Sequence, residues 1–238
     1  ISSCDLHGFT GACFLPCNMS FTVVGDFDFG KLSDTVEKRM MKYAPAGAPA
    51  SAVIAPEVTV NRFRKDENKK NHQSNCIIGA PAYSLYDERR IPLVLLMNIL
   101  GGPSSNSRLN SQLRERKALV YNIEATYSQY VRTGSAVIYF GCEKENVDTC
   151  VRLVLEELDK VRSKPLSSTA LMYAKKQLLA QNAISSENGE VQVLAIGKSL
   201  LAYGDYMSDD QVRSRVEALS AEDLQTVACD IFAPDKLS

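Results

Sequence analysis

Two neighbouring strand-like segments place the tightest limit on how this chain can fold. Residues 120–130 and 135–142 each have the composition of a β-strand, and the short segment between them carries a hairpin signal. A hairpin pairs its two strands antiparallel. Two more strand-like runs, 58–63 and 74–80, precede it, and only helical patterns follow it. We therefore predict an α+β fold, with an antiparallel-rich sheet and helices on one face.

The remaining segments of the main part have apolar residues at helical spacing. Segments 87–100 and 106–117 lie before the hairpin, and Gly101-Gly102-Pro103 between them is interpreted as a flexible corner. The helices expected after the hairpin cover 147–161, the stretch beyond Pro165, 191–203, 208–219 and a last helix that begins with the capping pair Ser220 and Asp223.

The N-terminal part is predicted to form a separate strand and helix. Residues 19–25 are β-rich and end at a glycine, and residues 29–43 carry apolar side chains at helical intervals. The next stretch is rich in Ala, Pro and Gly and is interpreted as a linker. The sequence therefore divides into 1–43, a linker at 44–57 and a main domain at 58–238.

Composition argues against two classes of function. The formal net charge is −1 and 23% of residues are charged, whereas nucleic-acid binding uses a strongly basic surface. No apolar run reaches the roughly 18 residues that a membrane-spanning helix needs. We therefore predict no nucleic-acid partner and no membrane span.

The cysteines do not form a recognisable framework. The chain has seven, an odd number, and most lie in apolar segments, which is typical of reduced and packed thiols. Cys4, His7, Cys13 and Cys17 are close enough in sequence to gather around a metal ion, but their spacing matches no zinc template. We expect packed thiols there and leave the role of this group open.

The chain lacks the residues that hydrolysis needs. A hydrolase uses a nucleophile, or a metal-bound water with a base. The only two histidines, His7 and His72, have no glutamate at helical spacing, and the chain contains no Gly-x-Ser-x-Gly sequence. We therefore predict no catalytic residue and no metal site in this chain.

Arg114 and Tyr121 are the candidate binding residues. They lie seven residues apart, one at the end of a predicted helix and the other at the start of the following strand. A guanidinium and a phenol at such a junction can bind the carbonyl groups of an extended peptide, with Tyr121 as a hydrogen-bond donor. The alternative for Arg114 is a solvated charge at the end of a helix.

Several short motifs occur in a fixed order along the chain. Residues 16–28 form the first, and residues 134–141 form the last. Between them lie Leu100-Gly101-Gly102, Ser107-Arg108-Leu109 and the run from Leu113 to Tyr121. In this order they resemble the second-half signature of the pitrilysin and mitochondrial-processing-peptidase family of zinc metallopeptidases. The Gly-Gly-Pro-Ser-Ser form at 101–105 departs from the family's usual pattern.

The resemblance implies a metallopeptidase half-domain of the mitochondrial-processing-peptidase-like type. In that family two halves enclose a chamber, and one half carries zinc on an inverted His-x-x-Glu-His motif. The other half is usually degenerate and contributes an Arg and a Tyr that hold the substrate, here matched by Arg114 and Tyr121. This chain has no His-x-x-Glu-His motif. The resemblance thus implies that zinc is held by a partner half.

The resemblance also implies what the chain binds. Its partners would be an extended peptide and an N-terminal catalytic half, or a separate catalytic subunit. Residues 1–43 would be the strand–helix remnant of the preceding half. We hypothesise that they either pack as the remnant of that half or fill the place of a missing closing strand of the main domain. The alternative function is a non-enzymatic scaffold or assembly subunit beside a separate zinc-bearing subunit.

Overall fold

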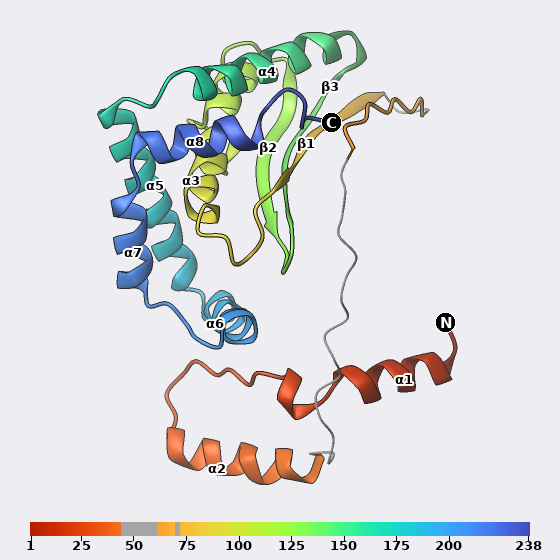
Figure 1. Cartoon of the computed structure of the whole chain (residues 1–238), viewed down its shortest axis with the longest axis vertical. Coiled ribbons are helices and arrows are strands. Elements are labelled where there is room, and N and C mark those ends of the chain that lie inside the picture. The colour runs from red at the N-terminus through yellow and green to blue at the C-terminus, as the bar shows by residue number, and fades with distance from the viewer. Residues whose placement is uncertain (44–60, 70–71) are drawn as a thin grey trace. The chain divides into compact units, whose positions relative to one another are not determined.

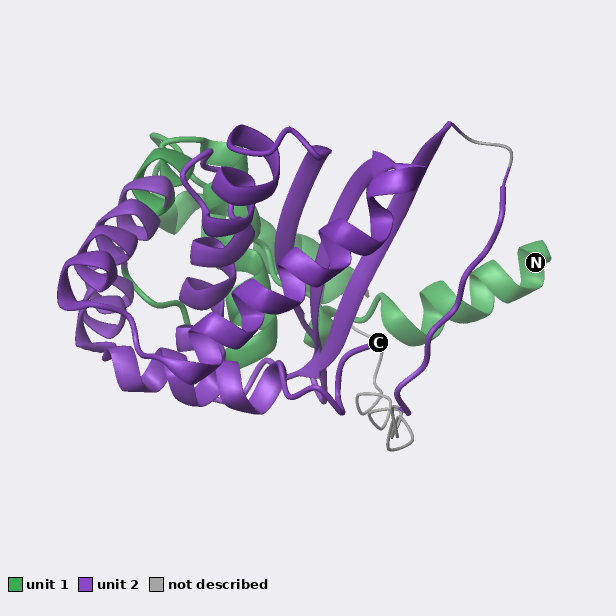
Figure 2. Ribbon diagram, turned by 90° about the horizontal axis from the view of Figure 1, so that it is seen from above, with its two compact units in different colours: residues 1–57, 182–208 green, residues 58–181, 209–238 purple. Residues whose placement is uncertain are grey.

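The computed structural model describes residues 1–43, 61–69 and 72–238 in two compact units. Unit 1 holds the described part of residues 1–57 together with 182–208, and unit 2 holds the described part of 58–181 together with 209–238 (Figure 2). The grouping of residues 182–208 with the N-terminal part was not predicted from the sequence. The predicted linker at 44–57 lies outside the described residues, and the division at 1–43 stays a prediction.

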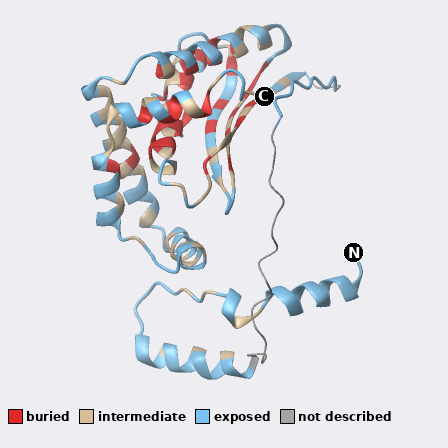
Figure 3. Cartoon of the chain, in the orientation of Figure 1, coloured by how far each residue is buried: buried red, intermediate tan, exposed pale blue. Residues whose placement is uncertain are grey.

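Unit 1 is built from helices and one extended segment. Its helices, labelled in Figure 1, are α1 (Ser3–Cys13), α2 (Phe29–Met40) and α6 (Gly189–Tyr203), with short 3-10 turns at Pro16–Asn18 and Met41–Tyr43. None of these three helices contains a buried residue. In the part of unit 1 that the structure describes, no side chain is buried, in contrast to unit 2 (Figure 3).

The predicted strand at 19–25 is wrong. These residues are extended but belong to no sheet, and they lie against α6 instead. The hydroxyl of Ser20 donates to the carbonyl oxygen of Gly197 at 3.2 Å. A strand is stable only beside another strand, and no described strand pairs with this segment. The hypothesis that it replaces a closing strand of the main domain is therefore also wrong.

Unit 2 is a three-stranded antiparallel sheet with helices on one face, as predicted. The sheet order is β1-β3-β2, and the predicted hairpin forms as β2 and β3. The strands are β1 (Gln73–Ala82), β2 (Val120–Gln129) and β3 (Gly134–Glu143). The helices are α3 (Arg90–Gly101), α4 (Val147–Ser163), α5 (Ser168–Ser186, which runs on into unit 1), α7 (Asp209–Ala218) and α8 (Ala221–Ile231), with a π-helix at Asn110–Glu115 and a 3-10 turn at Lys144–Asn146.

Alternation along the strands produces the two faces of the sheet. Ile123, Ala125, Ile138 and Phe140 point to the helices and are buried, and each fully buried large side chain stabilises the fold by roughly 1.5–3 kcal/mol. The residues between them on β2, including Glu124, are exposed. Figure 3 shows red on α3, α4 and α8, and red segments along the strands. One face of the sheet is therefore left open.

Helix α3 lies at the centre of unit 2 because both of its sides are apolar. Leu96 and Leu100 join the main core beneath the sheet. Leu95 faces the other way, into a smaller cluster with Leu178 and Leu224. A helix that is buried on two sides needs apolar residues at most of its positions. The sequence of α3 is apolar in this way, and a mostly buried helix was predicted there.

A polar cluster ties the segment after β1 to the C-terminal part of unit 2. The Asp230 carboxylate on α8 accepts hydrogen bonds from the Lys236 ammonium at 2.6 Å and from the Tyr83 hydroxyl at 2.7 Å. The Arg89 guanidinium lies 4.3 Å from the centre of the Tyr83 ring. Lys236 and Tyr83 hold the pKa of Asp230 below its usual value.

The outer edge of β1 is met by the C-terminal residue. Gly79 and Ser238 exchange two backbone hydrogen bonds, 2.9 Å and 2.8 Å long. The backbone N–H of Phe63 donates to the Ser238 hydroxyl at 3.2 Å. Residues 61–63 are not a strand, so that part of the predicted strand 58–63 is wrong, and the rest lies outside the described residues. The outer edge of β2 has no strand partner among the residues described.

Candidate substrate-binding site

The segment that carries Arg114 is helical, as predicted, and residues Asn110–Glu115 form a π-helix. Leu109 and Leu113 are both fully buried, which anchors this segment on the core. The backbone N–H of Arg116 reaches the Ser111 carbonyl, five residues back, at 3.1 Å. Hydrogen bonding over five residues widens the helix, and such turns occur frequently at functional sites.

The connection from the π-helix to β2 is strained. Ala118 has φ of 50°, in the left-handed region that a residue with a Cβ rarely adopts. Two backbone bonds fix this turn: the N–H of Ala118 to the Arg114 carbonyl at 3.1 Å, and the N–H of Leu119 to the Leu113 carbonyl at 2.8 Å. Strain of this kind clusters at binding and catalytic sites and costs of order 1–3 kcal/mol.

A β-bulge turns Tyr121 out of the regular alternation. Val120 pairs with Cys142 and Asn122 pairs with Gly141, so Tyr121 is the extra residue between them. Tyr121 and Asn122 are consequently both exposed, whereas strict alternation would expose only one of them. The bulge thus presents the phenol, which is 56% exposed, at the start of β2.

Glu143, the last residue of β3, binds the Tyr121 side chain. The Tyr121 hydroxyl donates a hydrogen bond to the Glu143 Oε1 atom. This hydrogen bond raises the pKa of the Tyr121 phenol, because a neighbouring carboxylate disfavours the phenolate. Sequence reasoning missed Glu143. The bulge that brings the two side chains together leaves no periodic signal, since only the register of β2 against β3 reveals it.

Arg114 differs from Tyr121 in having no fixed partner. Its side chain is exposed, and the described residues provide neither a hydrogen bond nor an ion pair to its guanidinium. The structure places both predicted site residues on one junction, Arg114 on the π-helix and Tyr121 on the strand that follows. A free guanidinium donates hydrogen bonds in a planar fork, which suits carbonyl and carboxylate oxygens.

The open face of the sheet continues from this junction. Tyr139 on β3 donates from its hydroxyl to the Asn75 side-chain oxygen on β1 at 2.7 Å. Ile77 is 67% exposed on the same face, and Glu124 is exposed on β2. This face therefore carries a mixture of polar and apolar side chains, with Val137 of β3 among the apolar ones.

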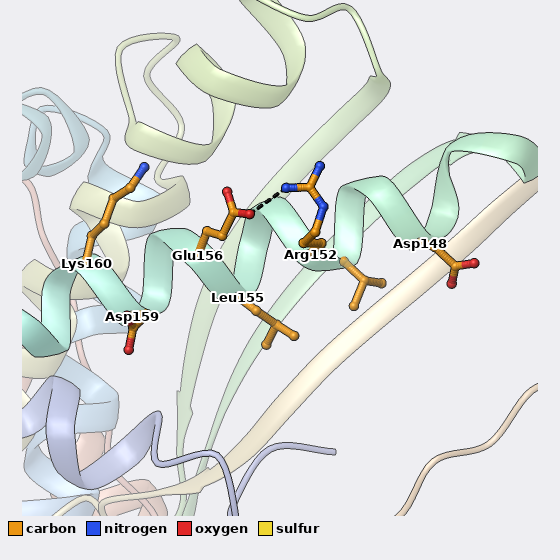
Figure 4. A pocket seen from close by; sticks show the side chains of 7 residues that line it. Asp148, Arg152, Leu155, Glu156, Asp159 and Lys160 are labelled. Atoms are coloured by element: carbon orange, nitrogen blue, oxygen red, sulfur yellow. Dashed lines mark hydrogen bonds and ion pairs between the residues drawn. The ribbon is translucent and has the colours of Figure 1, made fainter.

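A shallow groove on α4 lies apart from the junction. It is lined by residues between Asp148 and Lys160 of that one helix. Figure 4 shows Leu155 and Asp159 pointing to one side, while Arg152 and Glu156 form an ion pair of 2.5 Å on the other. Neither Arg114 nor Tyr121 lines it.

The residues that the structure describes do not fit a zinc ion. Three or four His, Cys or carboxylate ligands must converge on zinc, and within residues 1–43, 61–69 and 72–238 no group of three such side chains does so. Cys4, Cys13 and Cys17 are free thiols with exposed side chains, so the expectation of packed thiols in this group is wrong. The His7 side chain is exposed as well. In the same part of the chain, no helix is long and apolar enough to cross a bilayer.

Comparison with known proteins agrees with a sheet that is covered by helices on one face and with the lack of a zinc-ligand group among the described residues. A family model described as the peptidase M16 inactive domain matches residues 1–178. The chain therefore belongs to the M16 family of zinc peptidases, as its inactive domain. It is similar to an uncharacterised zinc protease of Streptomyces coelicolor, with 28% identity over 222 residues, covering 91% of this chain and 48% of the relative.

Solved structures show the same fold. The peptidase M16 inactive domain from Pseudomonas fluorescens matches with a TM-score of 0.74 and 19% identity, over 90% of this chain and 51% of that one. A chain of complex III2 from Candida albicans matches with a TM-score of 0.76 and 16% identity, over 90% of this chain and 52% of the other. The chain spans about half the length of the curated relatives it matches.

Proposed function

We propose that this chain is the substrate-binding, chamber-forming half of a zinc metalloendopeptidase and is not catalytic alone. A catalytic half, on the same polypeptide or on a separate subunit, holds the zinc ion and the general base. The chain forms one wall of the chamber and grips an extended peptide. The observation that carries this proposal is the junction of the π-helix with β2, which presents Arg114 and Tyr121 beside an open sheet face.

Several features of unit 2 suit an extended peptide. Arg114 offers donors to a backbone carbonyl, and the outer edge of β2 has backbone groups that no described strand pairs. A peptide that adds to a strand edge is held through its main chain, so it binds with little dependence on side chains. That mode fits an enzyme that cleaves many peptides.

Unit 1 supports the proposal that residues 1–43 belong with the catalytic half. Its described residues have no buried core of their own, and α1 and α2 expose large apolar side chains, among them Leu6, Phe9 and Phe29 at 58%, 59% and 76%. Apolar helices without a core are stabilised by packing against another apolar surface. The catalytic half is the partner that we propose for them.

The test is Arg114→Ala in the enzyme assembled with its catalytic half. Removing a positioned donor that acts on the substrate lowers kcat/KM by about tenfold to a thousandfold. Bound zinc, measured by elemental analysis, is expected to stay at the wild-type level. Arg116→Ala, two residues away and also exposed, is the matched control. Peptide turnover by the Arg114 variant at the wild-type rate would reject the proposal.

A second candidate function is supported by the similarity to a chain of complex III2. In this alternative the chain is a non-enzymatic scaffold or assembly subunit beside a zinc-bearing partner. Peptidase assays of the assembly with the wild-type chain and with the Arg114→Ala variant separate the two. Activity that depends on Arg114 favours the first function, and activity that does not depend on it favours the second.

A further inference from the structure

The amide side chains of the neighbouring helices α3 and α5 (Figure 1) form one connected network. The Asn98 carboxamide on α3 donates to the Gln181 side-chain oxygen on α5 at 2.8 Å, and its own oxygen accepts from Gln177 at 3.5 Å. Gln177 in turn accepts from the Asn106 carboxamide at 2.9 Å. Gln177 and Gln181 are four residues apart, so both side chains leave the same face of α5.

The network holds the corner between α3 and the π-helix, residues 102–106. Gln181 donates to the Ser104 hydroxyl at 3.0 Å, so one carboxamide accepts from α3 and donates to the corner. A Cβ on Gly102 would lie 2.6 Å from the Asn98 carbonyl oxygen and 2.8 Å from the Asn98 side-chain nitrogen. Only a residue without a Cβ lets the chain turn this close to α3. The corner is therefore fitted against α3 and tied to α5.

The corner in turn fixes the start of the segment that carries Arg114. The Ser107 N–H donates to the Ser104 carbonyl at 3.0 Å, and the Ser111 N–H donates to the Ser107 carbonyl at 2.8 Å. The Asn110 carboxamide donates to the Ser107 hydroxyl at 3.1 Å. Ser107 and Asn110 are buried, at 3% and 6% exposed, and a hydrogen bond that is shielded from water is electrostatically stronger. A connected chain of hydrogen bonds thus runs from α5 to the π-helix.

We infer that Gln181 is a positioning residue, which fixes the corner through Ser104 and thereby the place from which Arg114 reaches the peptide. The inference rests on the proposed function and adds to it a residue on α5. The Arg114 guanidinium has no partner among the described residues, so the position of its backbone decides where it reaches. Misplacing a group that holds the substrate by about 1 Å is enough to lower catalysis by about a hundredfold. Gln181 acts through the corner and does not touch the substrate.

A double-mutant cycle between Gln181 and Arg114 tests the inference in the enzyme assembled with its catalytic half. Gln181→Ala is expected to lower kcat/KM by about threefold to a hundredfold, and by no more than Arg114→Ala does. In the Arg114→Ala background, Gln181→Ala is expected to change kcat/KM by less than about twofold, because the side chain through which Gln181 acts is already gone. Bound zinc is expected to stay at the wild-type level in every variant.

Three further variants separate positioning from a general loss of stability. Ser104→Ala removes the same hydrogen bond from the other side and is expected to reproduce the loss in kcat/KM, which keeps the test available if Gln181→Ala does not fold. Ser104→Thr keeps the hydroxyl that accepts from Gln181 and is expected to restore most of the activity. Asn182→Ala is the matched control, because it removes an exposed carboxamide from the next position of α5 and is expected to behave as wild type.

The ways of failing are distinct. If Gln181→Ala and Ser104→Ala lower the urea midpoint but cleave peptide at the wild-type rate, the network is only structural and the inference is wrong. The inference is equally wrong if Gln181→Ala costs the same factor with and without the Arg114 side chain. In both cases a loss caused by Arg114→Ala leaves the proposed function standing. If Arg114→Ala alone cleaves peptide at the wild-type rate, the proposed function itself fails.

Discussion

Replacing Gly134 by alanine is expected to destabilise unit 2 strongly. Gly134 opens β3 directly after the hairpin turn, and a Cβ at this position would overlap the Tyr83 carbonyl oxygen and lie 3.0 Å from the Tyr127 ring. Overpacking of a tight site costs about 1–3 kcal/mol. The Tyr127 hydroxyl donates to that same carbonyl at 2.7 Å, and losing this bond adds about 0.5–1.5 kcal/mol. Together they predict a loss of roughly 2–4 kcal/mol.

The matched control is Gly79→Ala on β1. A Cβ there would lie 3.6 Å from the Ala136 carbonyl oxygen and 3.8 Å from a Val137 methyl group, both ordinary contacts. Alanine also loses less backbone entropy than glycine on folding, so this variant is expected to be neutral or more stable by up to about 1 kcal/mol. Urea unfolding followed by far-UV circular dichroism measures both. A Gly134 variant within about 0.5 kcal/mol of wild type would refute the packing argument.

Three further predictions concern single contacts. Glu143→Ala is expected to lower the pKa of Tyr121, which the carboxylate raises; carbon-13 NMR titration of labelled tyrosine in the full chain measures it, and an unchanged titration would contradict the contact. Asp230→Asn is expected to destabilise the fold above the ordinary carboxyl pKa of 3.8. Since the folded-state pKa is depressed, the difference from wild type disappears as pH falls through it, and a difference that persists in acid would count against the ion-pair explanation. Ser220→Ala is expected to cost about 1 kcal/mol by removing the cap of α8, where Ser220 and Asp223 form the predicted capping box; equal urea midpoints would argue against this.

The features predicted correctly from sequence are those with a long periodic signal. The two hairpin segments were predicted correctly and form β2 and β3. One face of each strand is buried, so apolar and polar residues alternate along it, and this alternation is recognisable in the sequence. The segment 106–117 was predicted to be helical and is so, but its apolar spacing does not distinguish five-residue from four-residue hydrogen bonding. The segment 19–25 has β propensity without a partner strand, and propensity alone does not supply one.

Two residues of the candidate site were predicted from the sequence, and a third was not. Arg114 and Tyr121 were found because they lie within a short motif whose order and spacing are readable. Glu143 was not found, because its contact with Tyr121, 22 positions away in sequence, depends on a one-residue slip in the register of β2 against β3. A search for two-residue alternation does not detect a β-bulge, because the extra residue of the bulge interrupts that alternation.

On this sheet, the residues that stabilise the fold are different from the residues that form the exposed surface. The helices attach to the strands through one set of alternate residues, while Glu124 and Thr126 on the other set hold nothing in place. Exchanging such residues therefore alters the polarity and charge of this face at little cost to folding, usually within about 0.5 kcal/mol. The surface properties of this face and the packing of the strands against the helices are therefore set by different residues of the same strands.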